Sequence, residues 1–353
     1  MNITLVVRYF TIGGLERVVS SLANGYVSRG YNVKIVVLSK GKRNSLITEI
    51  DPKVEVVFLK DKIWNKISQL RNETKNSLVH IHFGDGRIHP IIRLGLIGRK
   101  IVITCHSVYS HKRNTLLNLF DYLFSFQAKK IIAVSAAVKD FCVNEVHMKE
   151  DKVCVIRNGI ECNEDIIERE KGEVLKIVSL ASLYPHKNHI YLIKALAAFK
   201  SVCDIPFKLY MIGDGPCMSD LYLESLKLGL KDNIIWYGAI WQKDLVRSIV
   251  KAADVFVSAS EYEGFPISIL EGLVYGLPMV LSNIPPHIEI CGEGALYFDF
   301  DENYCSFIDK MKQFYNEDGC AKKMSAYSYE RCKEYNMAKT IDQYLGMYEE
   351  VIG

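Results

Sequence analysis

Residues 255–278 read VFVSASEYEGFPISILEGLVYGLP, and this stretch decides the fold. An apolar run leads into a loop with Gly264 and Pro266, and a helical segment follows from about residue 267 to residue 275. Units of this kind recur along the whole chain, and their repetition predicts parallel sheets with helices on both faces. The sequence therefore predicts an α/β fold built from doubly wound, Rossmann-like domains.

Two domains are expected, because 353 residues exceed what one hydrophobic core usually serves. The charged stretch CNEDIIEREKGEV at 162–174 has no apolar periodicity and is interpreted as a linker. It separates a first domain at 1–161 from a second at 175–336, and a C-terminal helix at 337–353 is expected to pack back toward the first domain. Two such domains predict a ligand cleft between the carboxyl ends of their sheets. The expected strands lie at residues 3–7, 33–38, 54–59, 78–82, 101–104, 131–134 and 153–156, then at 176–181, 207–212, 233–237, 255–258, 278–282 and 295–298.

The net charge of +3 conceals an asymmetry between the two halves of the chain. Residues 1–160 hold 25 Lys and Arg against 12 Asp and Glu, a net charge of +13, whereas residues 161–353 hold 19 against 29, a net charge of −10. The basic half favours an anionic partner, such as a phospholipid surface or a lipid-diphosphate carrier, but it fits a merely solvated surface equally well. The basic residues are dispersed and no recognition motif accompanies them, so nucleic acid is not expected as a partner.

The sequence carries no pattern typical of export or of a membrane span. Its opening residues, MNITLVVRYF, lack a basic segment and a small-residue cleavage site, and no uncharged apolar run approaches the roughly 18 residues of a spanning helix. Ten cysteines occur without a CxxC pair, which is typical of reduced, mostly buried thiols. We therefore expect a cytoplasmic protein, with peripheral contact to the inner face of the cell membrane as the alternative to a fully solvated one.

Glu263 precedes the helical segment at 267–275, and Glu271 lies within it. The first backbone N–H groups of a helix have no internal partners, so its start suits a diphosphate or a sugar hydroxyl. Glu263 precedes this start, and the two carboxylate oxygens of Glu271 can accept hydrogen bonds from both hydroxyls of a ribose. The alternative is a solvated pair of carboxylates that matches the helix dipole, and the pair taken alone favours that alternative.

Other candidate binding residues follow expected strands. Lys187, in LYPHKN at 183–188, can neutralise a phosphate with its ammonium group, or it is a solvated lysine in a turn. Gly213, in the turn GDGP, allows the backbone to approach a ligand or simply turns the chain. Gly13 and Gly14 connect the first strand to the first helix and permit a phosphate at that helix's N-terminus, although the loop does not match GxGxxG.

Three histidines lie at or near the ends of strands in the first domain. His106, in ITCHS, ends the fifth expected strand and is expected to point into the cleft, although a lone histidine there is more often structural than catalytic. His80 and His82 share one strand face, but no third ligand accompanies them, so no metal site is expected.

The stretch TLLNLFDYLFSF at 115–126 is unusually aromatic, and Lys112, Arg113, Lys129 and Lys130 flank it. It is either a core helix or an interfacial membrane contact. The core interpretation is the favoured one.

Taken in order, these segments resemble the retaining GT-B glycosyltransferases of family four, also called group 1 glycosyltransferases. The resemblance covers essentially the whole chain, and it implies two Rossmann-like domains facing across a cleft. It also implies transfer of a hexose-type sugar from a nucleoside diphosphate, with UDP favoured, to a glycan or lipid-linked glycan in the synthesis of a cell-surface polysaccharide such as lipopolysaccharide or capsule. The segments that carry it are GGLERVVSSLA, ITCHS, IIAVS, VIRNGIE, LASLYPHKNH, MIGDGP, EGFPISILE and SNIPPHIEI.

The resemblance assigns roles at the matching positions. Lys187 would hold the diphosphate and Glu271 the ribose. Glu263 and the backbone of the next three residues would hold the donor sugar, Gly14 would approach the phosphate, and His106 would lie beside the transferred sugar. His106, Lys187 and Glu263 are thus the implied catalytic residues. The implied donor-binding residues are Gly13, Gly14, Lys187, Gly213, Gly264, Phe265, Pro266 and Glu271.

One position departs from the family's pattern. The family often carries an arginine five positions before the lysine, and here that position is Ser182. The diphosphate would then depend on Lys187, the helix start and the glycine loop, with no metal or further cofactor. The rival interpretations are a sugar-nucleotide epimerase of the same architecture and a non-catalytic sugar-nucleotide-binding partner of a polysaccharide assembly complex, and Ser182 is the only support for the latter.

Overall fold

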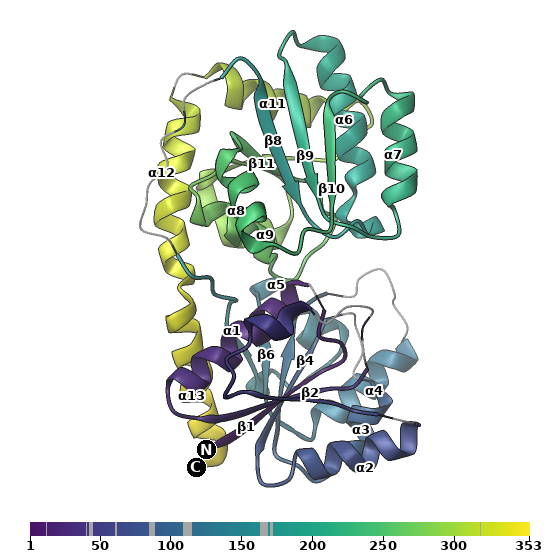
Figure 1. Cartoon of the computed structure of the whole chain (residues 1–353), viewed down its shortest axis with the longest axis vertical. Coiled ribbons are helices and arrows are strands. Elements are labelled where there is room, and N and C mark those ends of the chain that lie inside the picture. The colour runs from purple at the N-terminus through teal and green to yellow at the C-terminus, as the bar shows by residue number, and fades with distance from the viewer. Residues whose placement is uncertain are drawn as a thin grey trace. The chain divides into compact units, whose positions relative to one another are not determined.

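The computed structural model divides into two compact units, Met1–Gly159 with Met337–Gly353, and Ile160–Asn336. Each unit contains a parallel sheet with helices on both faces (Figure 1). Most of the linker expected at 162–174 lies outside the described residues. The structure describes residues 1–11, 13–39, 41, 45–60, 62–84, 89–108, 115–162, 169, 172–317 and 319–353.

The first unit has a seven-stranded sheet with the order β3-β2-β1-β4-β5-β6-β7. Its central strands are buried on both faces, which is why they appear in the sequence as continuous runs of Val, Ile and Leu. The chain winds outward in opposite directions from β1 and β4, which are neighbours. The strands are β1 (Asn2–Val7), β2 (Asn32–Val37), β3 (Glu55–Phe58), β4 (Leu78–Phe83), β5 (Ile101–Cys105), β6 (Ala128–Ala133) and β7 (Val153–Val155).

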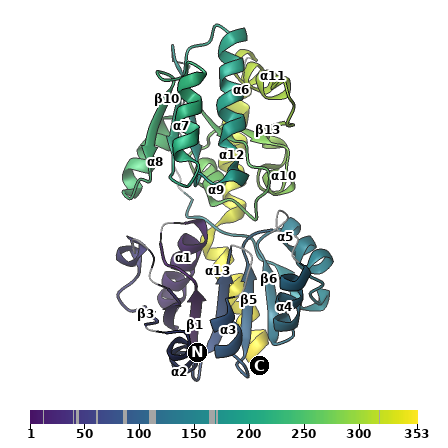
Figure 2. The same cartoon turned by 90° about the vertical axis from the view of Figure 1, so that its right-hand side faces the viewer.

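The C-terminal helix α13 (Met337–Ile352) packs against α1 (Gly14–Ser28) in this unit. The contact is close, because the Tyr26 and Tyr348 hydroxyls lie 3.1 Å apart in the interior. On the other side of the sheet, α3 (Pro90–Gly95) and α4 (Thr115–Ser125) lie in front of β5 and β6 in Figure 2, with α13 behind. The remaining helical segments are η1 (Ser45–Glu49), α2 (Ile63–Glu73), α5 (Ala136–Asp140), the π-helical turn η2 (Phe141–Glu145) and η3 (Glu150–Lys152).

The second unit has a six-stranded parallel sheet with the order β10-β9-β8-β11-β12-β13. Here β8 and β11 are the neighbours from which the chain winds in opposite directions. The strands are β8 (Leu175–Leu180), β9 (Phe207–Ile212), β10 (Ile234–Gly238), β11 (Val255–Ser258), β12 (Met279–Ser282) and β13 (Ala295–Phe298). The helical segments are η4 (Pro185–Lys187), α6 (His189–Val202), α7 (Met218–Lys227), α8 (Lys243–Ala252), α9 (Ile267–Val274), α10 (Pro285–Cys291), η5 (Gly292–Gly294), α11 (Cys305–Asn316), α12 (Cys320–Cys332) and η6 (Lys333–Tyr335).

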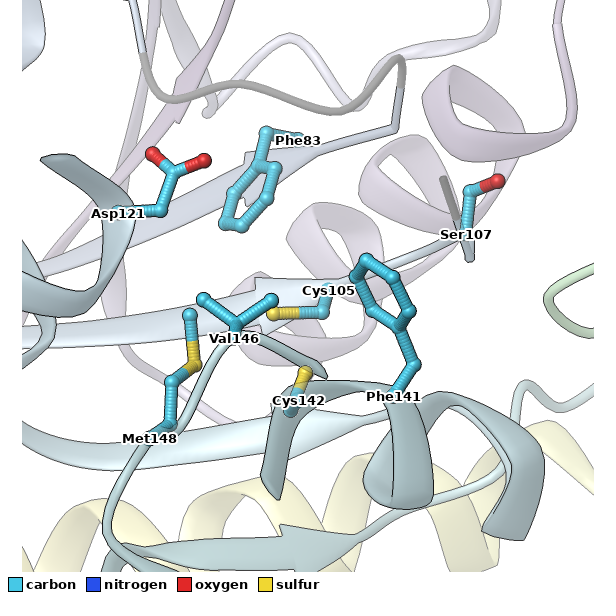
Figure 3. Close-up of a pocket in the computed structure, with 8 residues that line it drawn as sticks. All are labelled: Phe83, Cys105, Ser107, Asp121, Phe141, Cys142, Val146 and Met148. Carbon is cyan, nitrogen blue, oxygen red and sulfur yellow. The ribbon is translucent and has the colours of Figure 1, made fainter. Parts of the chain in front are cut away.

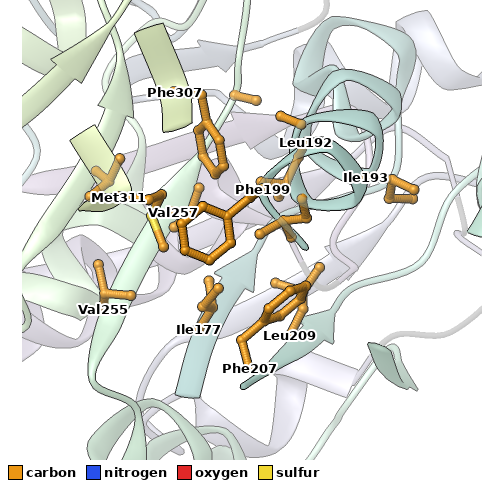
Figure 4. Close-up of a cluster of buried hydrophobic side chains, with 14 of the residues drawn as sticks. Ile177, Leu192, Ile193, Phe199, Phe207, Leu209, Val255, Val257, Phe307 and Met311 are labelled. Carbon is orange, nitrogen blue, oxygen red and sulfur yellow. The ribbon is translucent and has the colours of Figure 1, made fainter. Parts of the chain in front are cut away.

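One face of this sheet carries a large apolar core. The aromatic ring of Phe199 on α6 lies among strand residues such as Ile177 and Leu209 and helix residues such as Phe307 and Met311 (Figure 4). All five side chains are fully buried. This packing fixes α6 and α11 against β8 and β9. The loops that follow these strands therefore start from a rigid edge of the sheet.

The expected fold class is confirmed, because both units are parallel α/β sheets of the Rossmann type. Every expected strand overlaps a strand of the structure, and 207–212, 255–258 and 295–298 coincide with β9, β11 and β13. The largest difference is β6, which begins at Ala128, three residues before the expected start at 131. The prediction missed these residues because Lys129 and Lys130 interrupt the apolar pattern of the strand. Within the described ranges, no helix is both long enough and apolar enough to cross a membrane.

Candidate functional site

Lys187 and Glu263 meet at the carboxyl edge of the second unit's sheet. Lys187 ends η4, which follows β8, and Glu263 lies in the loop between β11 and α9. These two strands are the neighbours at which the winding direction reverses, and open α/β sheets bind ligands at that point. The Lys187 ammonium group donates a hydrogen bond to Glu263 Oε1 and forms an ion pair with it. The structure thus brings two of the three predicted catalytic residues together.

This ion pair is largely withdrawn from water. The side chains of Lys187 and Glu263 retain 14% and 9% exposure. Ser260 Oγ also donates a hydrogen bond to Glu263 Oε1, at 2.7 Å. Burial raises the pKa of the Glu263 carboxyl group, but the charge and hydrogen bond of Lys187, together with smaller effects that include the Ser260 hydrogen bond, outweigh burial and lower that pKa below its usual value. Glu263 is therefore ionised at neutral pH, and its charge compensates that of Lys187.

Hydrogen bonds between three loops hold the pair in place. The backbone N–H of Glu261 donates to the carbonyl oxygen of His186 at 2.9 Å, and the rings of His186 and Tyr262 stack with centroids 4.9 Å apart. Ser282 Oγ, at the end of β12, donates to the carbonyl oxygen of Ser260 at 2.6 Å. The loops after β8, β11 and β12 therefore form one connected edge.

Two buried histidines lie near the ion pair without adding charge. Burial, with a smaller contribution from the Lys187 ammonium group, lowers the pKa of His189 to about 4. Burial also lowers the pKa of His287 to about 4, although the Glu263 carboxylate opposes that shift. His287 Nδ1 donates to the carbonyl oxygen of Ser282 at 2.9 Å. Both imidazoles are neutral at pH 7, so the ion pair dominates the local charge.

Helix α9 begins four residues after Glu263. Pro266 is its N-cap, and the buried ring of Phe265 packs edge-on against Tyr335 with centroids 5.4 Å apart. Gly264 is buried as well, and Glu271, the fifth residue of α9, is partly exposed. The predicted donor-binding residues of this segment therefore lie on one strand–loop–helix unit. The structure also gives Phe265 a packing role that the sequence did not indicate.

Gly213 is required by the packing of two loops. It has φ +144°, and a Cβ atom built on it would lie 1.8 Å from the carbonyl oxygen of Ala181. Its backbone N–H donates to the carbonyl oxygen of Gly238 at 2.9 Å. Of the two interpretations made from the sequence, a close approach to a ligand and a chain turn, this geometry supports the second.

The predicted residues of the first unit gather at the carboxyl edge beside β1, β4 and β5. Gly13 is the N-cap of α1 in an extended conformation, and Gly14 begins the helix. A Cβ atom built on Gly84, which follows β4, would lie 3.0 Å from Leu15 Cδ1 and 4.0 Å from His106 Cβ. The start of α1 and His106 are therefore close neighbours at this edge.

His106 is not a lone histidine. Its Nε2 lies 3.0 Å from Nδ1 of His82, and the ring of His82 lies 3.9 Å from the ring of His80. His80 continues the contacts to the Tyr348 hydroxyl and to Thr104 Oγ1, at 2.5 and 2.7 Å. Burial lowers the pKa of His106 to about 3 and the pKa values of the other two histidines well below the usual range. All three imidazoles are therefore neutral at pH 7.

A small, mostly apolar pocket lies at the carboxyl ends of β4 and β5. Cys105 and Ser107, which flank His106 in the chain, both contribute to its wall. The thiols of Cys105 and Cys142, both labelled in Figure 3, form a hydrogen bond with each other at its wall. Its lining residues are Phe83, Cys105, Ser107, Asp121, Phe141, Cys142, Val146 and Met148.

The core interpretation of residues 115–126 is wrong for one face of α4. Asp121 and Phe124 are buried, but four apolar residues of this segment are exposed, as are two residues at α3. The flanking Lys112 and Arg113 lie outside the described residues. The six exposed residues, with exposures of 43% to 56%, form what we call the α3–α4 apolar surface: Leu94, Ile97, Leu119, Phe120, Leu123 and Phe126.

The sequence did not single out several residues of these clusters. Ser260 and Ser282 were visible only as polar residues near strand ends, and His287 only as part of a quoted segment. His82 was considered only as a metal ligand. Within the part of the chain that the structure describes, no group of three or more His, Cys, Asp or Glu is arranged to hold a metal ion.

Solved structures with the same fold are glycosyltransferases of the GT-B class. The structure of HepE from Anabaena in complex with UDP and glucose superimposes with a TM-score of 0.83 over 99% of this chain and 100% of that chain, at 17% sequence identity. At that identity the match defines the fold. It places the chain in the GT-B class.

Family models and relatives identify the chain further. Residues 12–164 match the model of glycosyltransferase family 4, and residues 163–331 match that of glycosyl transferases group 1. The chain therefore carries a glycosyltransferase family 4 domain followed by a glycosyl transferases group 1 domain.

Two relatives belong to lipid-linked or O-antigen glycan synthesis by name. The UDP-Gal:alpha-D-GlcNAc-diphosphoundecaprenol alpha-1,3-galactosyltransferase of Escherichia coli is 31% identical over 61% of this chain, and the match spans only 60% of that protein. The O-antigen chain mannosyltransferase RfbU of Salmonella typhimurium is 26% identical over 64% of this chain and 68% of that protein.

Proposed function

We propose that the chain transfers a hexose-type sugar from a nucleoside diphosphate, with UDP favoured, to a hydroxyl group of a glycan or lipid-linked glycan, with retention of the anomeric configuration. The observation that carries this proposal is the buried Lys187–Glu263 ion pair at the reversal point of the second sheet, directly before the helix that bears Glu271. The product belongs to a cell-surface polysaccharide such as lipopolysaccharide or capsule, and the reaction takes place in the cytoplasm.

The comparisons support UDP as the nucleotide. The E. coli relative is named for UDP-Gal, and HepE was solved with UDP and glucose. The O-antigen mannosyltransferase supports the class of product but not the nucleotide. These names do not indicate which sugar is transferred, because one refers to galactose, one to glucose and one to mannose.

In the proposed reaction, the bond between the anomeric carbon and the β-phosphate oxygen breaks. The acceptor oxygen forms its new bond on the same face of the sugar, and the acceptor's proton passes to the departing diphosphate. Lys187 and the first N–H groups of α9 stabilise the negative charge that develops on the diphosphate. Glu271 accepts hydrogen bonds from the ribose, and Glu263 contacts the donor sugar. This accounts for both carboxylates without a protein nucleophile.

The first unit contributes the remaining residues of the proposal. Gly13 and Gly14 leave room for a phosphate at the start of α1, and His106 contacts the transferred sugar. The backbone of residues 264–266 contacts the donor sugar as well. Gly213 acts through the shape of its turn, since its own geometry is set by Ala181.

The α3–α4 apolar surface supports peripheral contact with an anionic membrane. Its six exposed apolar residues lie in the half of the chain with a net charge of +13. Lys149 Nζ lies 5.5 Å from the ring centre of Phe126, and the guanidinium of Arg93 lies 5.3 Å from that of Phe120. Apolar side chains bordered by cations suit the interface of a bilayer with anionic headgroups. This surface would keep the enzyme close to a lipid-linked acceptor.

A thermal-shift series with UDP, ADP, GDP and TDP tests the nucleotide site. A nucleotide at 100 times its Kd adds about 2.7 kcal/mol to the free energy of unfolding, so one of the four should stand out. UDP-glucose, UDP-galactose and UDP-N-acetylglucosamine are then incubated with the enzyme, and released UDP is measured with and without a glycan acceptor. The proposal fails if no nucleotide diphosphate stabilises the protein.

The same experiment separates the two rivals. An epimerase would convert the free UDP-sugar into its epimer without an acceptor and without releasing UDP. A non-catalytic partner would bind UDP and release none from any UDP-sugar. The observation that favours the non-catalytic partner is Ser182. This residue is exposed after β8, at the position where the family often has arginine.

A further inference from the structure

Three histidines form a buried column in the first unit. His80 and His82 lie on one face of β4, and His106 follows β5 on the same side. The ring centroids of His80 and His82 are 3.9 Å apart, and those of His82 and His106 are 5.3 Å apart. The proposed function uses only His106, so the roles of the other two are unassigned.

The bond between His82 and His106 contains a single proton. His82 Nδ1 and His106 Nε2 lie 3.0 Å apart, which is a hydrogen-bond distance. Burial lowers the pKa values of both imidazoles so far that both are neutral at pH 7. A neutral imidazole carries one N–H and one bare nitrogen, so one ring donates and the other accepts.

The surroundings of His82 decide which ring donates. Its second nitrogen, Nε2, is buried and has no hydrogen-bond partner among the described residues. His80 does not serve that nitrogen, since its own ring nitrogens lie against Tyr348 and Thr104. If His106 donated, the proton of His82 would sit on this buried Nε2 as an N–H without an acceptor. Buried N–H groups without an acceptor are rarer in proteins than buried acceptors without a donor.

We propose that His82 is a positioning residue that fixes the tautomer of His106: His82 Nδ1–H donates to His106 Nε2, and His106 therefore carries its own proton on Nδ1. With Nε2 engaged as an acceptor, Nδ1–H is the group that His106 offers at the carboxyl edge of the sheet. His106 then acts as a hydrogen-bond donor and not as a general base. Its target, a sugar or phosphate oxygen of the donor, rests on the proposed function.

Nitrogen-15 NMR of the whole chain tests this assignment without any substrate. Long-range ¹H–¹⁵N correlation distinguishes the protonated from the bare nitrogen of each histidine ring, and His106→Asn identifies the signals of His106 by their loss. We expect Nδ1 of His106 to be protonated in the wild-type protein. A wild-type spectrum with the proton on Nε2 overturns the proposal.

Two variants test whether His82 is the cause. In His82→Leu the donor is lost, so His106 should change to the Nε2–H form that free imidazole side chains prefer in water. In His82→Asn the side-chain amide N–H can replace Nδ1–H, so His106 should keep Nδ1–H. The exposed His147→Asn is the matched control and should leave the signals of His106 unchanged. The same tautomer of His106 in both His82 variants overturns the proposal.

Donor hydrolysis by the same variants provides a second measurement. We expect kcat to fall about ten- to a hundredfold in H82L, as for other residues that orient a functional imidazole, and to be largely retained in H82N. If H82L does not fold, the wild-type and H82N spectra decide the question. A protein with Nδ1–H on His106 that binds no nucleotide would refute the proposed function and leave the tautomer assignment standing.

Discussion

Replacing Lys187 with methionine should destabilise the second unit, because it leaves the Glu263 carboxylate buried without its counter-ion. The two side chains retain only 14% and 9% exposure, so water does not replace the lost ammonium group. Removing one partner of a buried ion pair typically costs about 3–5 kcal/mol of the free energy of unfolding. Ser260 Oγ still donates to the carboxylate, so we expect a cost nearer 3 than 5 kcal/mol.

Urea unfolding followed by tryptophan fluorescence measures this cost in the second unit. Two of the three tryptophans, Trp236 and Trp241, lie in that unit. Trp64 lies in the first unit and is 73% exposed, so Trp64→Phe removes its signal at little cost to stability. All variants are compared in this background, because a chain with two units need not unfold in one step.

Lys194→Met is the matched control for Lys187→Met. Lys194 forms an ion pair with Glu224 at 3.9 Å, and its side chain is 42% exposed. An exposed pair of this kind contributes at most about 1 kcal/mol. If K187M costs no more than K194M, the Lys187–Glu263 pair is not desolvated and the reasoning is refuted. The double variant K187M/E263Q should cost less than the sum of the two single variants, since it leaves no buried charge.

The free energy of unfolding that K187M loses should also depend on pH, and the direction of that dependence is an independent test. In the wild-type protein the pKa of Glu263 is below its ordinary value of 4.5, so its contribution to stability is present above that pH and is lost as the pH falls through the folded-state pKa. In K187M both contributions of Lys187 are lost, and burial, the largest cause, raises the pKa of Glu263 against the smaller effects of His287 and Ser260. The cost of K187M should therefore be largest at pH 7 and shrink toward pH 5. A cost that grows on acidification contradicts this account.

Three further variants address other parts of the molecule. Glu271→Ala should weaken UDP binding in calorimetry by at least tenfold, about 1.4 kcal/mol, and unchanged affinity for every nucleotide would remove Glu271 from the site. Leu123→Glu should reduce sedimentation with phosphatidylglycerol vesicles, whereas Leu223→Glu, at an equally exposed leucine of the second unit, should not; equal behaviour of the two would argue against the α3–α4 apolar surface. Gly213→Ala should cost about 3 kcal/mol or more in urea unfolding, because strain and a backbone clash add, whereas Gly229→Ala, with φ +69° and open space around it, should cost about 1 kcal/mol; similar costs would refute the clash.

The strands could be predicted because parallel strands buried on both faces appear as short apolar runs. The segment at 255–260 is such a run, and β11 begins and ends within it. The loop and helix that follow were equally clear, since Gly264 and Pro266 mark the turn and α9 begins at Ile267. The predicted residues of the second domain thus lie after the ends of strands or in the helix that follows, as the strand–loop–helix pattern indicated.

The ion pair and the histidine column could not be predicted from local pattern. Lys187 and Glu263 are 76 residues apart, and only the adjacency of β8 and β11 brings them together. The sequence assigned one to a phosphate and the other to a sugar, without expecting them to bind each other. His82 and His106 are 24 residues apart, and they meet because β4 pairs with β5.

The segment at 115–126 shows a different limit. Apolar residues occur on nearly all sides of this helix, so periodicity does not identify the side that faces the core. The structure buries Phe124 and also Asp121, which pairs with Arg93 of α3. The burial of Asp121 depends on an ion-pair partner from another helix, and no local sequence pattern reveals such a partner. Leu119 and Leu123 are exposed as a consequence.

The Lys187–Glu263 pair also explains why the diphosphate contact is the weakest part of the proposed site. At 4 Å and an effective dielectric constant of 20, an ammonium and a carboxylate attract each other by about 4 kcal/mol, and a phosphate oxygen at the same distance competes for the same charge. The ammonium group has three N–H donors, one of which Glu263 engages, so Lys187 can still reach a phosphate. Its field there is nevertheless reduced by the carboxylate beside it, and Ser182 supplies no second cation. The start of α9, with a charge equivalent of about half a unit, must then provide a substantial part of the stabilisation. Besides its proposed contact with the donor sugar, Glu263 therefore orients Lys187 and reduces the charge that Lys187 presents to the diphosphate.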